Sequence, residues 1–215
     1  EEKVSKVLSE RVTITGCSRT DTGVHANQFC FNVKTHSDIR CIGFERGVNG
    51  ELPDDISILS CEDVPADFHA RYDCIAKEYI YKIHCSESKD PFSTDLALHY
   101  RRQLRIDVMQ EAAKYLEGKH DFASFCADST KLSTTERTIY YIDIENCGTS
   151  VIILVKGNGF LYNMIRIITG TLLDVSEGRI APGDISGILE ARDRLRAGRT
   201  APAHGLYLNR VFYNE

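Results

Sequence analysis

Tryptophan is absent from the 215-residue sequence, methionine occurs only twice, and no long run of apolar residues is present. The longest apolar runs, such as 151–155, fall far short of the roughly 20 residues that a membrane-spanning helix needs. No segment with a charged start and an apolar stretch opens the chain, as a secretory signal would. We therefore expect a soluble protein that is neither exported nor anchored in a membrane, and we place it in the cytoplasm.

Closely spaced cysteine and histidine pairs are also missing. The eight cysteines form no Cys-x-x-Cys, and neither His-x-x-x-His nor Cys-x-x-His occurs, although structural zinc sites normally contain such a pair. We therefore expect no metal ion. In a protein that is not exported, we expect the cysteines to be buried, reduced thiols.

The composition is that of an ordinary globular protein. Hydrophobic residues make up 42% and charged residues 27% of the chain, which excludes disorder, collagen and a coiled coil. The formal net charge is −5. Because attraction of a whole surface to phosphate needs positive charge, this balance argues against a protein coated in nucleic acid. It is compatible with a local basic groove.

Hydrophobic periodicity predicts strands and helices that do not alternate strictly. The predicted strands are 11–15, 27–33, 56–60, 77–84, 137–145, 150–156 and 207–213. The predicted helices begin near Val4, at Ser37 or Asp38, at Asp107 with Gln110 completing a capping box, at Tyr162 and at Pro182. This mixture predicts the α+β class with a largely antiparallel sheet. Segment 86–95, which contains Pro91, is the best candidate for a boundary between two domains.

The loop 16–26 places a carboxylate between two predicted strands. Asp21 follows Arg19 by two residues, and Gly23 lets the backbone bend so that the carboxylate can face a cleft. A nearby cation would hold such a carboxylate ionised. The alternative is a turn in which Asp21 binds local backbone N–H groups.

A second stretch, 157–166, leaves a predicted strand through glycines and enters an apolar helix. Arg166 is the only cation between Lys156 and Arg179. A cation in such surroundings needs an anionic partner or a cleft, unless its side chain reaches solvent. Tyr79 and Tyr81 lie at strand spacing, which fits both core packing and a stacking platform.

Five blocks in order carry a resemblance to a known family. They are Arg19-Thr20-Asp21-x-Gly23-Val24-His25, Phe68-His69-Ala70-Arg71, Lys77-x-Tyr79-x-Tyr81, Gly159-Phe160-Leu161-Tyr162-Asn163-Met164-Ile165-Arg166 and Ala201-Pro202-Ala203-x-Gly205-Leu206. Together they resemble the TruA family of tRNA pseudouridine synthases, over residues 4–213 of this chain. No single block is as specific as the ordered set.

The resemblance implies an isomerase that converts uridine to pseudouridine in the anticodon stem-loop of tRNA, at positions 38 to 40, with no metal and no organic cofactor. It implies a homodimer whose two subunits are both crossed by tRNA. The implied fold is that of the pseudouridine synthases, with two ferredoxin-like lobes of mostly antiparallel sheet around a central cleft. The N-terminal lobe is expected at residues 1–90 and the C-terminal lobe at 91–215.

The resemblance also implies roles for single residues. Asp21 matches the catalytic aspartate, Tyr79 the tyrosine that lies against the target base, and Arg166 the arginine that pairs with the aspartate. Substrate contacts are implied for Arg19, Arg71, His25, Tyr81, Phe160, Gly205 and Leu206. Among these, Arg19 and Arg71 are expected near phosphates or the flipped nucleotide, and the Gly205-Leu206 block is expected to line the floor of the site.

The sequence departs from the family pattern at two points. Ser18 stands where relatives often have glycine. The family also carries a strand and loop with Tyr-x-Gly-Trp-Gln ahead of the Arg-Thr-Asp motif, and this sequence does not contain them. We therefore expect that an N-terminal segment of a few tens of residues, including the first strand of the lobe, is missing from it.

Three other functions and one ambiguity stay open. The chain could catalyse the same reaction on another RNA, be a catalytically silent RNA-binding module, or be an unrelated hydrolase that uses Asp21 with His25. Two groups of arginines could contact phosphate or simply form a solvated surface: Arg101, Arg102 and Arg105, and Arg192, Arg194, Arg196 and Arg199.

Overall fold

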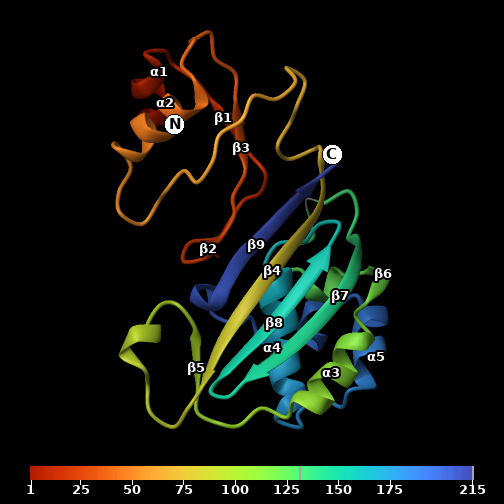
Figure 1. Cartoon of the computed structure of the whole chain (residues 1–215). Helices are drawn as coiled ribbons and strands as arrows, with labels where there is room; N and C mark the ends of the chain where they lie inside the picture. The colour runs from red at the N-terminus through yellow and green to blue at the C-terminus, as the bar shows by residue number, and fades with distance from the viewer. Residues whose placement is uncertain (131, 215) are drawn as a thin grey trace. The chain divides into compact units, whose positions relative to one another are not determined.

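The computed structural model describes residues 1–130 and 132–214 and divides the chain into two compact units. Unit 1 contains residues 1–19, 29–74 and Asn214, and unit 2 contains 20–28 and 75–213. The elements, in chain order, are α1 Glu2–Leu8, β1 Ile14–Gly16, β2 His25–Ala26, β3 Phe31–Val33, α2 Cys41–Asn49, β4 Cys74–Cys85, η1 Pro91–Ser93, β5 Leu98–Tyr100, α3 Ile106–Lys114, β6 Gly118–Asp121, η2 Ala123–Phe125, β7 Glu136–Cys147, β8 Ser150–Gly157, α4 Met164–Ser176, α5 Asp184–Ala191, η3 Arg194–Arg196, η4 Ala203–Gly205 and β9 Leu206–Tyr213 (Figure 1).

Unit 1 is a small layer of two helices and two strands. Strands β1 and β3 pair antiparallel, with Thr15 opposite Asn32. Helix α1 supplies Val4 and Leu8 at the predicted helical spacing, whereas α2 buries Phe44 and Val48 and leaves Ile42 exposed. The core of this unit consists of Val4, Leu8, Val12, Phe44 and Val48.

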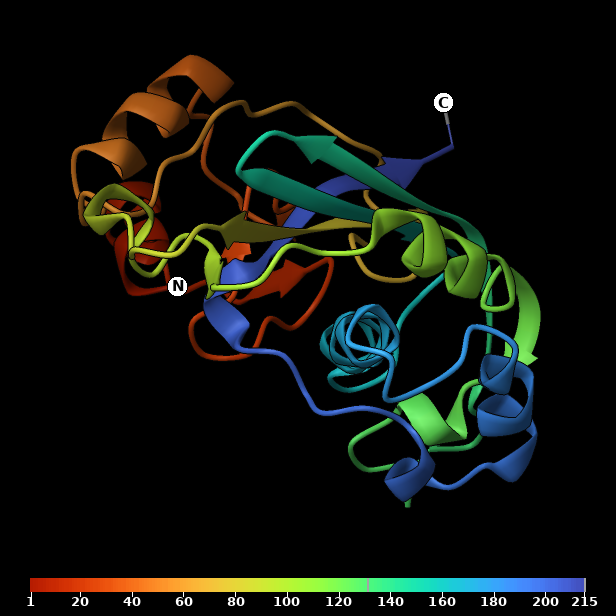
Figure 2. The same ribbon diagram turned by 90° about the horizontal axis from the view of Figure 1, so that it is seen from below.

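Unit 2 is built on a seven-stranded sheet in the order β2-β9-β4-β8-β7-β6, with β5 pairing to β4. The pairs β4–β8, β7–β8 and β6–β7 are antiparallel, whereas β2–β9 and β4–β5 are parallel. Helices α3, α4 and α5 lie on one face of this sheet (Figure 2). The predicted α+β class with a largely antiparallel sheet is confirmed.

Helix α4 is the centre of unit 2. Every one of its 13 residues except Arg166 is buried. A helix that is buried nearly all round must be covered on several sides. Its C-terminal carbonyls are capped from outside, because Arg105 donates to the carbonyl oxygens of Ser176 at 2.7 Å and Val175 at 3.1 Å. Gly178, with φ +75°, then ends the helical path as predicted.

Several local predictions were wrong. No strand occupies 56–60, because the side chain of Asn49 binds both the N–H of Ile58 at 2.6 Å and its carbonyl at 2.9 Å, where a neighbouring strand would otherwise bind. The strands predicted at 11–15 and 27–33 are the shorter β1 and β3, and β2 lies inside the predicted loop 16–26.

The predicted helix caps were also wrong. Helix α2 begins after Arg40 and α3 after Arg105, and neither has a side-chain cap. Ser37 accepts a hydrogen bond from the N–H of Ile39, which lies before α2. Asp107 lies inside the first turn of α3, where a carboxylate favours the helix through its dipole instead.

The boundary at 90/91 between two lobes stays a prediction. The two compact units part between Cys74 and Ile75, at the start of β4. Of the eight cysteines, which were expected to be buried, only Cys17 and Cys126 are buried, and Cys147 is exposed. Within residues 1–130 and 132–214, no helix is long and apolar enough to cross a membrane.

The core of unit 1 gives a first testable prediction. Val48 is 0% exposed in α2, whereas Ile42 in the same helix is 50% exposed. We expect Val48→Ala to lower the free energy of unfolding by about 2 kcal/mol, because it leaves a cavity. Ile42→Ala removes more atoms, but from the surface, and should cost less than about 0.5 kcal/mol. Urea unfolding of both variants measures the difference, and equal losses would contradict the described core.

Candidate active site

A charged pair joins the loop that precedes β2 to helix α4. Arg166 Nη1 lies 3.1 Å from Asp21 Oδ2, within unit 2. The side chain of Arg166 is 18% exposed and that of Asp21 is 33% exposed. The cation in the apolar helix therefore has a carboxylate partner, and one side of that carboxylate remains open to solvent.

Arg166 is held by more than its charge. Its Nε donates to the carbonyl of Ala201 at 2.7 Å, and its Nη1 donates to Asn163 Oδ1 at 2.8 Å. The N–H of Ala201 returns a hydrogen bond of 3.0 Å to the carbonyl of Arg166. Asn163 precedes α4 with φ +60°, a conformation that asparagine tolerates better than most residues. These contacts fix the plane of the guanidinium before any substrate binds.

The loop of Asp21 turns through its backbone and not through its carboxylate. The N–H of Val24 donates to the backbone carbonyl of Asp21 at 3.0 Å, and Gly23 takes φ +83°. Few side chains adopt that conformation, which explains the glycine. The carboxylate is thereby left for Arg166, so the alternative of a locally bonded turn does not describe Asp21.

Tyr79 and Tyr81 lie on one side of β4, as their spacing predicts. Both are buried, at 7% and 0% exposure. The ring of Phe160 meets that of Tyr79 edge to face, with centroids 5.2 Å apart. Gly157 makes room for Phe160, since a Cβ at this position would lie 3.1 Å from its ring. The loop between β8 and α4 thus brings Phe160 against Tyr79.

Tyr81 supports the backbone near the charged pair. Its hydroxyl donates to the carbonyl of Pro202 at 2.8 Å, next to Ala201. Burial raises the pKa of Tyr81 far above its ordinary value, although the charges of Arg166 and Arg199 oppose this. Gly205 lies under the same ring, where a Cβ would come within 2.7 Å of it. The role of Tyr81 as a substrate contact stays a prediction.

His25 is occupied away from Asp21. Its ring stacks on that of Tyr207 with centroids 4.6 Å apart, and its Nε2 lies 2.8 Å from the carbonyl of Asp95. Leu206 is buried at the start of β9, one residue before Tyr207. The arrangement gives no support to a hydrolase in which His25 activates Asp21.

The two other predicted arginines, Arg19 and Arg71, belong to unit 1. Both are exposed. Arg71 lies over the ring of Tyr72 at 5.9 Å, and the N–H of the preceding Ala70 binds Asn32 of β3 at 2.9 Å. Their contacts with substrate stay predictions.

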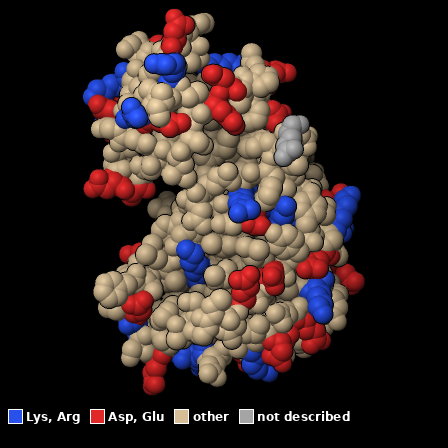
Figure 3. Space-filling model, in the orientation of Figure 1, with Lys and Arg blue, Asp and Glu red and all other residues tan. Residues whose placement is uncertain are grey.

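Several arginines of the two groups left open between phosphate contact and a solvated surface make contacts within unit 2. Arg105 caps α4, and Arg194 donates to the carbonyls of Ala197 and Gly198 and to the hydroxyl of Thr200. Arg192 pairs with Asp121 at 3.0 Å. On the face of unit 2 shown in Figure 3, both signs of charge are interspersed.

Sequence reasoning missed the three groups that brace these side chains. Asn163 stands in a recognised block and is the last residue before an apolar helix, so its amide was a visible signal. The carbonyl of Ala201 and the ring of Tyr207 carried no such signal. In the part of the chain that the structure describes, no cluster of three or more His, Cys, Asp or Glu could hold a metal ion.

Known proteins are similar to this sequence over most of its length. A family model described as tRNA pseudouridine synthase matches residues 112–214. The tRNA pseudouridine synthase A 2 of Clostridium tetani (strain Massachusetts / E88) is 46% identical, covering 100% of this chain and 86% of that protein. The tRNA pseudouridine synthase A of Listeria monocytogenes serotype 4a (strain HCC23) is 48% identical, with 98% and 85% covered. That of Bacillus subtilis (strain 168) is 42% identical, with 100% and 88% covered.

These similarities define an isomerase that converts uridine to pseudouridine. The chain belongs to the TruA family of tRNA pseudouridine synthases. Among solved structures, a chain of the "Crystal Structure of a Cbf5-Nop10-Gar1 Complex" is 19% identical, with a TM-score of 0.26 over 65% of this chain and 32% of that one. This structural similarity is too low to support a conclusion.

The contact between Gly205 and Tyr81 gives a second prediction. We expect Gly205→Ala to lower the free energy of unfolding by about 1–3 kcal/mol, because its Cβ would collide with the buried ring and with the carbonyl of Lys82. Gly187 in α5 has nothing within 4 Å of its Cβ position. Gly187→Ala should therefore raise the free energy by roughly 0.5–1 kcal/mol. Thermal unfolding tests both, and effects of equal sign would contradict the packing.

Proposed function

We propose that this enzyme converts uridine to pseudouridine in the anticodon stem-loop of tRNA, at positions 38 to 40, with Asp21, Tyr79 and Arg166 as its reacting centre. The supporting observation is the Asp21–Arg166 pair, because its carboxylate is partly exposed while its guanidinium is fixed by Asn163 and Ala201. Such a pair presents one carboxylate group in a fixed direction.

The reaction defines what that carboxylate has to do. The bond from N1 of uracil to C1′ of the ribose breaks, the uracil rotates, and a bond from C5 to C1′ forms. The proton on C5 leaves and N1 takes one up, so the product is an isomer and no oxidant or reductant is needed. Asp21 can attack C1′ as a nucleophile or stabilise positive charge there, and both roles need its ionised form. Arg166 favours that form when a base excludes water.

Aromatic residues suit the handling of the detached base. Tyr79 has its ring fixed edge to face by Phe160, so it offers a rigid apolar surface to uracil. Its hydroxyl can hydrogen-bond the detached base while the C5 proton leaves. A uridine within a stem must be flipped out to reach this ring, at a cost of about a few kcal/mol. Contacts of Arg19 and Arg71 with phosphate would offset that cost.

Homodimerisation and a cytoplasmic location also belong to this proposal. Homodimerisation derives from the resemblance of the five sequence blocks to the family, and a cytoplasmic location from the sequence-based expectation that the protein is not exported. A symmetric pair of subunits would let one tRNA contact both copies, which suits a substrate larger than a single domain.

Mapping of the product tests the substrate. Full-length protein is incubated with unmodified tRNA transcripts, and pseudouridine is located by base-resolved chemical mapping. We expect product at positions 38 to 40 and nowhere else. Product outside the anticodon arm, or in another RNA alone, would overturn the assigned substrate. Binding of RNA without any product would support a silent RNA-binding module and sink the proposed reaction.

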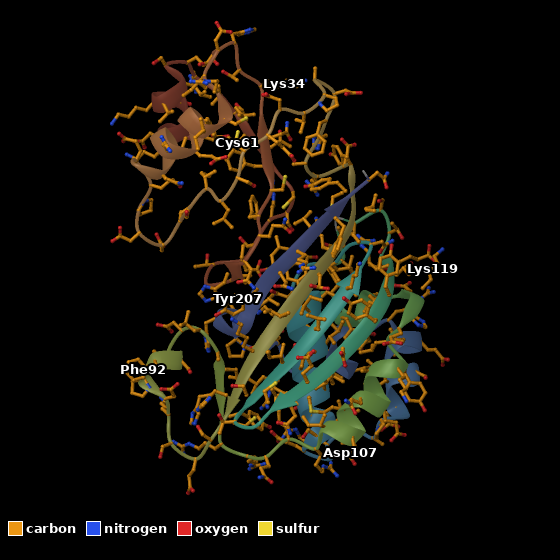
Figure 4. All side chains as sticks on the ribbon, in the orientation of Figure 1. Lys34, Cys61, Phe92, Asp107, Lys119 and Tyr207 are labelled. Atoms are coloured by element: carbon orange, nitrogen blue, oxygen red, sulfur yellow. The ribbon has the colours of Figure 1, made fainter. Side chains whose placement is uncertain are left out.

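Substitution of Asp21 tests the chemistry. Asp21→Asn keeps the size of the side chain but removes its charge, so we expect turnover to fall at least about 10³-fold while the affinity for tRNA changes less than about threefold. Asp107→Asn is the matched control, because Asp107 lies exposed at the start of α3 (Figure 4). It should leave turnover unchanged. Loss of tRNA binding or of folding in Asp21→Asn would indicate a structural Asp21.

A further inference from the structure

Residues 197–202, here called the strap, lie directly against the backbone of helix α4. A Cβ on Gly170 would lie 1.7 Å from the carbonyl oxygen of Arg199. A Cβ on Gly198 would lie 2.6 Å from Cα of Thr171. Two glycines thus remove the side chains that would otherwise separate the strap from the helix. Contact between two backbones leaves little freedom for either one to shift.

Two hydrogen bonds anchor the strap on either side of Ala201. On one side, the N–H of Gly198 donates to Thr171 Oγ1 at 2.9 Å, inside the protein. On the other, the carbonyl of Pro202 accepts from the hydroxyl of Tyr81. Ala201 lies between the anchors and exchanges two hydrogen bonds with Arg166. The position of the guanidinium is therefore coupled to that of the strap.

Thr171 is suited to this task because its hydroxyl has two neighbours. It donates to the carbonyl of Ile167 at 2.8 Å, which turns its lone pair toward the N–H of Gly198. The strap itself is stiffened by Arg194, whose guanidinium binds the carbonyl of Gly198 at 2.9 Å and Thr200 Oγ1 at 2.9 Å. A change at Thr171 would thus move the strap as a body.

We propose that Thr171 is a positioning residue for the isomerisation: its buried hydroxyl holds the strap, and the strap holds Arg166 in register with Asp21. Thr171 lies inside the protein, at 0% exposure, and is not a catalytic residue. The inference rests on the proposed function, since it assumes that the Asp21–Arg166 pair reacts with uridine. It adds a determinant of rate that does not touch the substrate.

The same helix contains a matched control. Thr169 is also 0% exposed, and within the described residues its Oγ1 is buried without a hydrogen-bond partner. Thr169→Val and Thr171→Val therefore make the same chemical change, two residues apart in α4. Only the second removes a hydrogen bond to the strap. Thr171→Ser restores the hydroxyl, and Thr171→Ala removes it without adding a methyl group near Gly198.

Rate and binding are measured separately in single-turnover assays on tRNA. We expect Thr171→Val to slow product formation by about tenfold to a hundredfold, with the dissociation constant of tRNA changed less than about twofold. Thr169→Val should stay within about twofold of the parent, and Thr171→Ser should recover most of the rate. Should Thr171→Val fail to fold, Thr171→Ala takes its place. Equal rates for the Thr169 and Thr171 variants would overturn the inference.

A double-substitution cycle tests the route through Arg166. If Thr171 acts through that guanidinium, Thr171→Val should slow Arg166→Lys by much less than it slows the parent. Full additivity of the two effects would show that Thr171 acts by another route, and would overturn the inference. A general loss of stability has no reason to depend on the residue at position 166.

Amide hydrogen exchange gives a readout that needs no activity. The N–H groups of Gly198 and Ala201 should exchange at least about tenfold faster in Thr171→Val and at the parental rate in Thr169→Val. Unchanged exchange would overturn the role of the hydroxyl. If the parent protein makes no pseudouridine, the proposed function fails and the catalytic part of this inference fails with it. The exchange result then reports whether the strap is held as described.

Discussion

The pairing of Arg166 with Asp21 is the constraint around which unit 2 is arranged. A guanidinium within a helix that is otherwise buried would cost several kcal/mol without a compensating charge. The carboxylate that compensates it comes from a loop 145 residues earlier in the chain. That loop leads into β2, which pairs with β9. Sheet order and ion pair therefore depend on each other, because the loop that leads into the edge strand β2 also brings the carboxylate to the helix.

Gly170 and Gly198 allow the strap to contact the backbone of α4 directly. The helix is covered by the sheet on one face, and by a strap whose backbone touches its own backbone at Gly170 and Gly198. Side chains at either position would push the strap outward and take the carbonyl of Ala201 away from Arg166. Close packing of the strap against α4 and the orientation of Arg166 therefore depend on the same two glycines. The same contact that stabilises the fold sets the direction of the guanidinium.

The sequence alone predicts those features that follow from the burial of particular residues. Arg166 among apolar neighbours demands an anion, and alternating residues in β4 demand a strand with Tyr79 and Tyr81 on one side. Prediction from the sequence fails where a side chain binds backbone groups that a neighbouring strand would otherwise bind, as Asn49 does at Ile58. It also fails for backbone acceptors, since every residue has a carbonyl and nothing marks that of Ala201. In both cases the structure depends on contacts between residues that lie apart in the sequence.

Several arginines are engaged with one carboxylate, that of Glu177, which the sequence did not indicate. Glu177 is surrounded by Arg102 at 3.6 Å, Arg199 at 3.3 Å and Arg179, and Tyr100 donates to it as well. Desolvation by burial raises the pKa of Glu177, but the hydrogen bonds from Tyr100 and Arg179 and the charges of Arg179 and Arg199 outweigh it and lower the pKa. Arginines engaged in this way contribute less to attraction of phosphate. In a chain with net charge −5, affinity for an RNA must therefore come from short-range contacts at particular residues and not from the field of the whole surface.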